Sequence, residues 1–98
     1  KERFIPGHGA GLPSQFLDKS SIYDVMHISD MECVTGCKKL LETESILAGG
    51  SSGAVTTAFL KRVPELPKNS KCVLILCDRG ERYLETIYNE KWVAKKLK

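Results

Sequence analysis

The sequence predicts an α/β fold, in which a parallel sheet with βαβαβα order is flanked by helices in a three-layer αβα arrangement. Two observations carry this prediction. Short apolar runs alternate with helical patterns from residue 23 to the end of the chain, which is typical of parallel strands joined by crossover helices. Glycines and hydroxyl residues at positions 49–53 also separate a short apolar run from a helical pattern. Parallel sheets build small-molecule sites at turns of this kind.

The first strand is predicted at residues 23–28 and the first helix at residues 29–43. Residues 23–28 are rich in strand-favouring side chains, and Ser29 with Glu32 forms the Ser-x-x-Glu pattern of a capping box. One face of the helix is apolar, so we expect it to cover a sheet. The residues on that face are Met31, Cys33, Val34, Cys37, Leu40 and Leu41.

The second strand is predicted at residues 46–48. Ser51 or Ser52 would cap the helix that follows, because serine favours the N-cap position. This helix carries no charge before Lys61, which indicates that most of its surface is buried, and Pro64 ends it.

The third strand is predicted at residues 71–76. It is continuous in apolar character, as expected for a central parallel strand that is covered on both faces. Gly80 and Glu81 would open a last helix with an inward apolar stripe. The residues of that stripe are Tyr83, Leu84, Ile87, Tyr88 and Trp92.

Composition and charge exclude several classes of protein. The 98 residues allow at most one domain, and 42% hydrophobic with 28% charged residues favours a globular chain over a disordered one. The longest apolar run, 72–77, is too short to span a bilayer, which needs about 20 residues. The net charge of +3 arises mainly from lysines at the C-terminal end, with no basic stripe interleaved with aromatic residues, so nucleic-acid binding is not favoured.

Lys1 is not an initiator methionine, and we expect the sequence to be a piece of a longer chain.

The four cysteines predict neither a metal site nor disulfides. Cys33 and Cys37 share one helical pattern, whereas Cys72 and Cys77 lie at the two ends of an apolar run. Neither pair has the short spacing of a zinc knuckle. We expect all four to be small buried hydrophobic residues of a protein in a reducing cytosol.

Three glycine-containing loops are candidate sites: 7–11, 49–53 and 77–80. Ligands of parallel sheets bind beyond the carboxyl ends of strands. The hydroxyls of Ser51 and Ser52 are either plain helix caps or ligand-binding groups, and the neighbouring glycines favour binding because they clear side-chain bulk from around the hydroxyls. His8 and His27 have no cysteine or carboxylate at a catalytic or metal-binding spacing.

Three stretches resemble the C-terminal part of the fold-type II pyridoxal-phosphate enzymes, which include cysteine synthase and cystathionine β-synthase. They are FIPGHGAGLPSQF at 4–16, ILAGGSSGAV at 46–55 and CVLILCDRGERYLETIY at 72–88. The resemblance implies that residues 1–98 are the C-terminal fragment of a tryptophan synthase β-like catalytic domain that binds pyridoxal 5'-phosphate. It also implies a cytoplasmic homodimer that acts on small amino-acid substrates and binds neither nucleic acid nor membrane.

Within this family, three stretches together are most similar to the siderophore-pathway branch that joins O-phospho-L-serine to L-glutamate. They are ECVTGCKKLLETESILAGG at 32–50, GGSSGAV at 49–55 and DRGERYLETIYNEKW at 78–92. Cysteine synthase, which uses O-acetylserine and sulfide, is the alternative. The implied reaction is a β-replacement, in which a leaving group is eliminated from an activated L-serine and an amine or thiol nucleophile is then added.

The resemblance also assigns residues. Ser51 matches the serine whose hydroxyl meets the pyridine nitrogen of the cofactor, Gly7 and Gly9 match a glycine turn near cofactor and substrate, and Asp78 matches a residue beside the pyridine ring. A neutral hydroxyl does not hold a proton on that nitrogen as an aspartate would, which favours prompt loss of a β leaving group. Cys77 departs from the pattern, because the family has proline there.

The family's Schiff-base lysine lies upstream of these residues, so the catalytic lysine is unknown and the fragment alone is expected to be inactive. Two readings from other classes stay open. One is a non-catalytic α/β module that binds a nucleotide or anion at residues 49–53. The other is a structural remnant with no ligand, which would leave the buried second helix without its cover.

Overall fold

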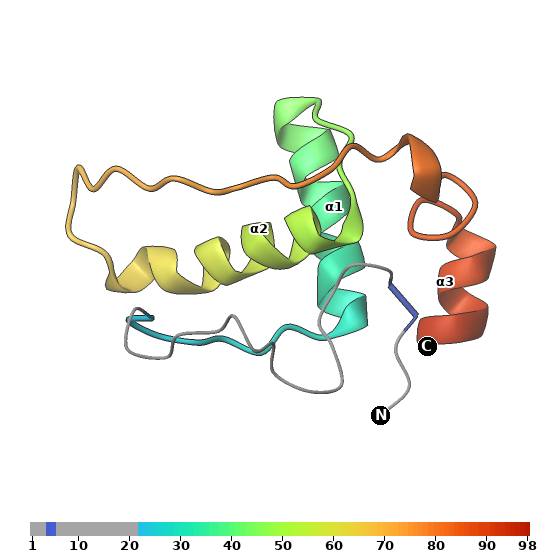
Figure 1. Ribbon diagram of the computed structural model, residues 1–98, viewed down its shortest axis with the longest axis horizontal. Coiled ribbons are helices and arrows are strands. Elements are labelled where there is room, and N and C mark those ends of the chain that lie inside the picture. Colours follow the sequence, from blue (N-terminus) through green and yellow to red (C-terminus); the bar gives the residue numbers. More distant parts are fainter. Residues whose placement is uncertain (1–3, 6–21) are drawn as a thin grey trace.

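The computed structural model describes residues 4–5 and 22–98, and the fold of these residues is built from helices (Figure 1). The α-helices are α1 (Asp30–Glu44), α2 (Gly50–Arg62) and α3 (Glu90–Leu97), and the short 3-10 helices are η2 (Val63–Glu65) and η3 (Glu81–Tyr83). In the part of the chain that is described, β-pairing is limited to one isolated antiparallel bridge between Ala48 and Arg79.

Helix α1 begins as the sequence predicts. Ser29 is its N-cap, the Ser29 hydroxyl accepts from the Glu32 backbone N–H at 3.1 Å, and the Glu32 carboxylate accepts from the Ser29 backbone N–H at 2.8 Å. These reciprocal bonds satisfy two N–H groups that the first turn leaves without partners. The helix ends at Ser45, which adopts a left-handed conformation (φ 57°) and donates its N–H to the Leu41 carbonyl.

Helix α2 begins earlier than predicted, so the prediction that Ser51 or Ser52 caps it is wrong. The N-cap is Gly49, in an extended conformation with φ −81° and ψ 176°. The Gly49 carbonyl accepts from the backbone N–H groups of Ser52 at 3.1 Å and Gly53 at 3.2 Å, which places both serines inside the first turn. The predicted end is confirmed, because the α-helix stops at Arg62, just before the turn that contains Pro64.

The predicted strands at 23–28, 46–48 and 71–76 are not formed among the described residues. All three segments are irregular except for the single bridge at Ala48. In Figure 1 the first segment, in cyan, and the third, in orange, run on opposite sides of α2, so neither can donate hydrogen bonds to the other. A strand exists only when a neighbouring chain segment pairs with it. The apolar side chains therefore stay exposed, as Val73 (87% exposed) and Ile75 (68%) show.

The predicted last helix is interrupted. The chain makes η3 and then turns through residues 84–88, and α3 starts afresh at Glu90. Asn89 causes the restart, because its side-chain oxygen accepts from the backbone N–H groups of Lys91 at 2.9 Å and Trp92 at 3.1 Å. The inward stripe is confirmed except at Leu84, which is 54% exposed.

The core lies where α1, the start of α2, the η3 turn and α3 meet. Ile5 also enters it, and the Phe4 backbone N–H donates to the Asp30 carboxylate at 3.1 Å. Of the cysteines, Cys33 and Cys37 are buried as predicted. Cys72 and Cys77 are exposed, because no element among the described residues covers the segment between them. The buried core residues are Ile5, Cys33, Val34, Cys37, Ala54, Tyr83, Ile87 and Val93.

No helix among residues 22–98 is long and apolar enough to cross a membrane.

Candidate functional site

Two of the predicted site loops lie together. Gly49 donates its backbone N–H to the Asp78 carbonyl at 3.1 Å, and Gly80 donates its backbone N–H to the Leu47 carbonyl at 2.9 Å. These bonds flank the bridge between Ala48 and Arg79. Residues 49–53 and 77–80, which are about 30 positions apart in the sequence, therefore form one continuous surface at the start of α2.

Ser51 lies in the first turn of α2 and is partly exposed. Its hydroxyl is not used as a cap, because Gly49 occupies the N-cap position. The first intrahelical bonds run from Ser52 and Gly53 to the Gly49 carbonyl, so the N–H groups of Gly50 and Ser51 are not used by the helix. The start of α2 thus carries the Ser51 hydroxyl and two backbone N–H groups without intrahelical partners, at the end where the helix dipole is positive.

Asp78 is fixed by a residue that the sequence analysis placed only in the core. The Tyr83 hydroxyl donates to Asp78 Oδ2 at 2.6 Å, and this bond is the main reason that the pKa of Tyr83 is raised above its ordinary value. The other carboxylate oxygen, Oδ1, is buried without a hydrogen-bond partner among the described residues. The only sequence signal for Tyr83 was its position in the inward stripe, five residues after Asp78.

The glycines around Ser51 serve packing, which corrects the expectation that they clear space around the hydroxyls. A Cβ at Gly49 would overlap the Asp78 carboxylate, and one at Gly50 would overlap the Ile5 side chain. Gly53 faces the backbone of α1 in the same way. Each position is glycine because another part of the chain already fills the space that a side chain would need.

The remaining sequence-predicted residues do not join this surface in the part of the chain that is described. Gly7, Gly9 and His8 lie outside the described residues, although the buried Ile5 packs against Gly50. His27 is exposed on the segment that precedes α1. Cys77, which precedes Asp78, is also exposed.

Ser52 is fully buried, and its hydroxyl has no hydrogen-bond partner among residues 4–5 and 22–98. It is therefore less suited than Ser51 to meet a ligand that arrives from solvent. The residue pattern left the two adjacent serines equivalent and the family resemblance singled out Ser51, and the structure gives them different burial.

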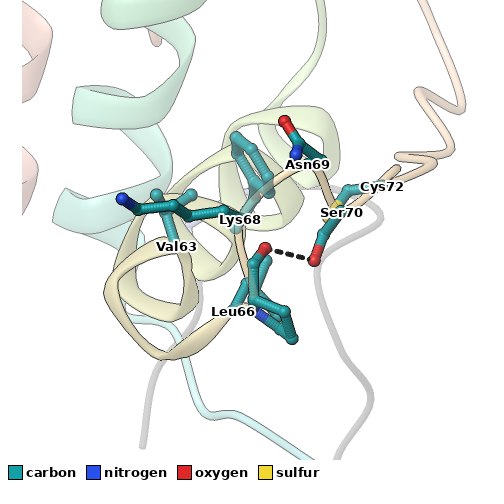
Figure 2. A pocket seen from close by; sticks show the side chains of 8 residues that line it. Val63, Leu66, Lys68, Asn69, Ser70 and Cys72 are labelled. Atoms are coloured by element: carbon teal, nitrogen blue, oxygen red, sulfur yellow. Dashed lines mark hydrogen bonds between the residues drawn. The ribbon is translucent and has the colours of Figure 1, made fainter.

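A hollow of about 420 Å³ opens at the opposite end of α2, and Figure 2 shows its lining. It is formed by the last turn of α2 and the loop after it, where the Ser70 hydroxyl donates to the Pro67 carbonyl at 2.5 Å. Because α2 rises about 1.5 Å per residue, this hollow lies roughly 18 Å from the Gly49 turn. It is lined by Phe59, Val63, Leu66, Pro67, Lys68, Asn69, Ser70 and Cys72.

Comparison with known proteins identifies the family. No protein-family model matches the chain. The chain is 42% identical over 93 residues to N-(2-amino-2-carboxyethyl)-L-glutamate synthase of Ralstonia nicotianae, an alignment that covers 95% of this chain and 28% of that enzyme. The crystal structure of O-ureido-L-serine synthase superposes with a TM-score of 0.84 and 26% identity, over 96% of this chain and 32% of that one. A lysine-to-alanine mutant of that synthase with O-ureido-L-serine bound gives a TM-score of 0.69 and 29% identity, over 81% and 27%.

The chain belongs to the fold-type II pyridoxal-phosphate enzyme family. It spans less than a third of the length of these relatives, so this surface is one part of what such an enzyme contains. The resemblance read from the three sequence stretches is confirmed.

The residues present fit the cofactor of this family. Ser51 offers a neutral hydroxyl that no cap consumes, and Asp78 Oδ1 is a buried acceptor without a donor among the described residues. A carboxylate oxygen left in this way is costly unless a ligand or another part of the protein supplies a donor. Ser51 is thus able to donate its hydroxyl to an acceptor atom of a polar heteroaromatic ring at the start of α2. Asp78 lies in the loop that meets this turn.

Proposed function

We propose that the polypeptide containing these residues is a pyridoxal 5'-phosphate-dependent transferase that joins O-phospho-L-serine to L-glutamate in siderophore precursor synthesis. The observation that carries the proposal is the 42% identity to N-(2-amino-2-carboxyethyl)-L-glutamate synthase over 95% of this chain. The local geometry supports it, because the Gly49 turn places the start of α2 beside Asp78.

The roles of the residues follow from their chemistry. When bound, the cofactor would supply the electron sink for a β-replacement on an activated serine. Ser51 would meet the ring nitrogen with a neutral hydroxyl, which leaves that nitrogen without the proton that a carboxylate would hold there. Asp78, fixed by Tyr83, would line the ring, and Gly7 and Gly9 would form a turn nearby.

The whole polypeptide would have the organisation that the family resemblance implies. Residues 1–98 would form the C-terminal part of a tryptophan synthase β-like catalytic domain, and the Schiff-base lysine would come from elsewhere in the polypeptide. The 98 residues alone would be inactive. The whole enzyme would work as a cytoplasmic homodimer on amino-acid substrates.

The test is the visible absorption spectrum of the longest natural polypeptide that contains these residues, recorded with pyridoxal 5'-phosphate. A cofactor band that changes on addition of O-phospho-L-serine, with phosphate release that then depends on L-glutamate, is the expected result. A response to O-acetyl-L-serine and sulfide instead would identify a cysteine synthase. A protein that stays colourless with added cofactor would rule out the proposed enzyme function and favour a non-catalytic α/β binding module.

A further inference from the structure

Tyr88 satisfies both backbone polar groups of Ala48. Its hydroxyl accepts from the Ala48 N–H at 3.2 Å and donates to the Ala48 carbonyl. Ala48 is 1% exposed, so water has little access to either group. Tyr88 comes from the turn between η3 and α3, 40 residues further along the chain. A single hydroxyl from a distant element therefore fixes the peptide groups just before α2.

Cys37, on α1, makes a hydrogen bond to Gly49, the residue that follows Ala48. Its thiol donates to the Gly49 carbonyl at 3.2 Å, from a fully buried position on α1. The same carbonyl accepts the first two intrahelical bonds of α2. Burial is the main cause that raises the pKa of Cys37 above its ordinary value, so the thiol keeps its proton at neutral pH and remains a donor.

The Tyr88 hydroxyl also stays protonated, because burial raises the pKa of this tyrosine, and the neighbouring Cys37 acts in the same direction. The entry to α2 is thus held by two neutral donors, one from α1 and one from the turn before α3. Ser51 follows Ala48 by three residues and Gly49 by two, and Gly49 is the N-cap of the helix that contains Ser51.

We propose that Tyr88 and Cys37 are positioning residues for cofactor binding: by fixing the peptide groups of Ala48 and Gly49 they set the direction in which the first turn of α2 presents the Ser51 hydroxyl. This inference rests on the proposed function, because it requires a cofactor at Ser51. Neither side chain needs to touch the cofactor or substrate for this role.

The experiment uses the longest natural polypeptide and compares Tyr88→Phe with Tyr23→Phe. Both substitutions remove one hydroxyl, but the Tyr23 side chain is fully exposed. The readouts are the dissociation constant for pyridoxal 5'-phosphate, measured by adding cofactor to cofactor-free protein, and the position of the visible band. Tyr88→Phe removes both bonds to Ala48. If this misplaces the Ser51 hydroxyl, cofactor binding should weaken about ten-fold, the size of the one hydrogen bond that Ser51 would then lose to the cofactor, and the band should shift, whereas Tyr23→Phe changes neither.

A second set of variants separates positioning from general destabilisation. Cys37→Ser keeps a donor at the Gly49 carbonyl and Cys37→Ala removes it, so we expect affinity to be retained in the first and lost in the second. Val34→Ala opens a cavity at another fully buried position of α1. It should lower the unfolding temperature of the cofactor-free protein and leave affinity and band unchanged when measured where every variant is folded.

Three results would overturn the inference. If Tyr88→Phe leaves both the cofactor affinity and the band unchanged, Tyr88 has no positioning role. If Cys37→Ser and Cys37→Ala bind the cofactor equally well, Cys37 has none. An equal loss of affinity in Val34→Ala would show that only stability matters. If the unsubstituted polypeptide binds cofactor, these failures leave the proposed function intact. If it binds none, the proposed function fails first and this inference fails with it.

Discussion

Gly36 of α1 and Gly53 of α2 meet where the two helices cross. A Cβ at Gly36 would overlap the Gly53 carbonyl oxygen, and a Cβ at Gly53 would overlap the Cys33 carbonyl oxygen. The helices are close enough for the Thr57 hydroxyl to donate to the Glu32 carbonyl at 2.8 Å. This contact fixes the direction of α2 and hence the position of its first turn.

Gly53→Ala should therefore destabilise the protein, although the same change in an exposed helix stabilises it by up to about 1 kcal/mol. The new methyl group meets backbone atoms that cannot rotate away, and overpacking of this kind costs about 1–3 kcal/mol. Denaturant unfolding measures the difference. Lys39→Ala on the exposed side of α1 is the control and should change stability by less than about 0.5 kcal/mol. A Gly53→Ala variant as stable as the parent would contradict this helix crossing.

The two adjacent serines should respond differently to alanine. Ser51→Ala removes the hydroxyl proposed to meet the ring nitrogen, so cofactor affinity should fall about ten-fold with little change in the stability of the cofactor-free protein. Ser52→Ala removes a buried hydroxyl that has no partner among the described residues. It should leave affinity unchanged and leave stability equal or higher by about 1 kcal/mol.

Cofactor titration and thermal unfolding of the same two samples measure both effects. The reverse pattern, with affinity lost in Ser52→Ala and retained in Ser51→Ala, would exchange their roles and reject the assignment of Ser51.

Local signals predicted the helices better than the strands. The start of α1 follows from Ser29 and Glu32 alone, because a capping box needs only residues three apart. The start of α2 was misplaced because Gly49 is held by Asp78, a contact distant in the sequence that no local pattern reveals. The interruption at Asn89 does carry a local signal, because an asparagine within an apolar stripe can cap a new helix.

The predicted strands failed for a different reason. Residues 71–76 have the composition of a central strand, but composition does not supply a hydrogen-bonding neighbour, and none lies beside them among the described residues. Residues 49–53 and 77–80 were both named as candidate site loops and lie together in the structure, and their role in binding stays a prediction. Their contact is an antiparallel bridge between loops.

The pH dependence of stability should include a contribution from Glu32. Its pKa is lowered below the ordinary value of 4.5, first by the bond from Lys61 (Nζ to Oε1 2.5 Å) and then by the Ser29 backbone N–H. A carboxyl with a lowered folded-state pKa contributes stability that is fully present above the unfolded pKa and is lost as pH falls through the folded pKa. The effect is small, because both partners are about 40% exposed.

Glu32→Gln should therefore lower the unfolding temperature at neutral pH and make no difference at a pH well below 4.5. The glutamine can still accept from the Ser29 N–H, so the variant removes the negative charge and keeps the capping-box hydrogen bond. Unfolding curves of parent and variant at several pH values provide the measurement. A constant difference across the acid range would assign the effect to packing.

Thiol reactivity should divide the four cysteines into two pairs in the 98-residue chain. Burial raises the pKa of Cys33 to about 12, and Cys37 is also buried with a raised pKa. Both thiols are therefore protonated and shielded, which makes them slow to react. Cys72 and Cys77 are exposed. A chromogenic disulfide reagent should thus modify two thiols rapidly and the other two only on unfolding.

Replacing both Cys72 and Cys77 by serine should abolish the rapid phase. In the longest natural polypeptide the same two thiols report on the apolar segment between them. If the rest of the protein covers residues 72–77, their rapid reaction should slow to the rate of Cys33 and Cys37, because coverage would bury Val73 and Ile75 together with them. Equal rapid reaction in both forms would show that this segment stays uncovered and would count against its prediction as a central strand.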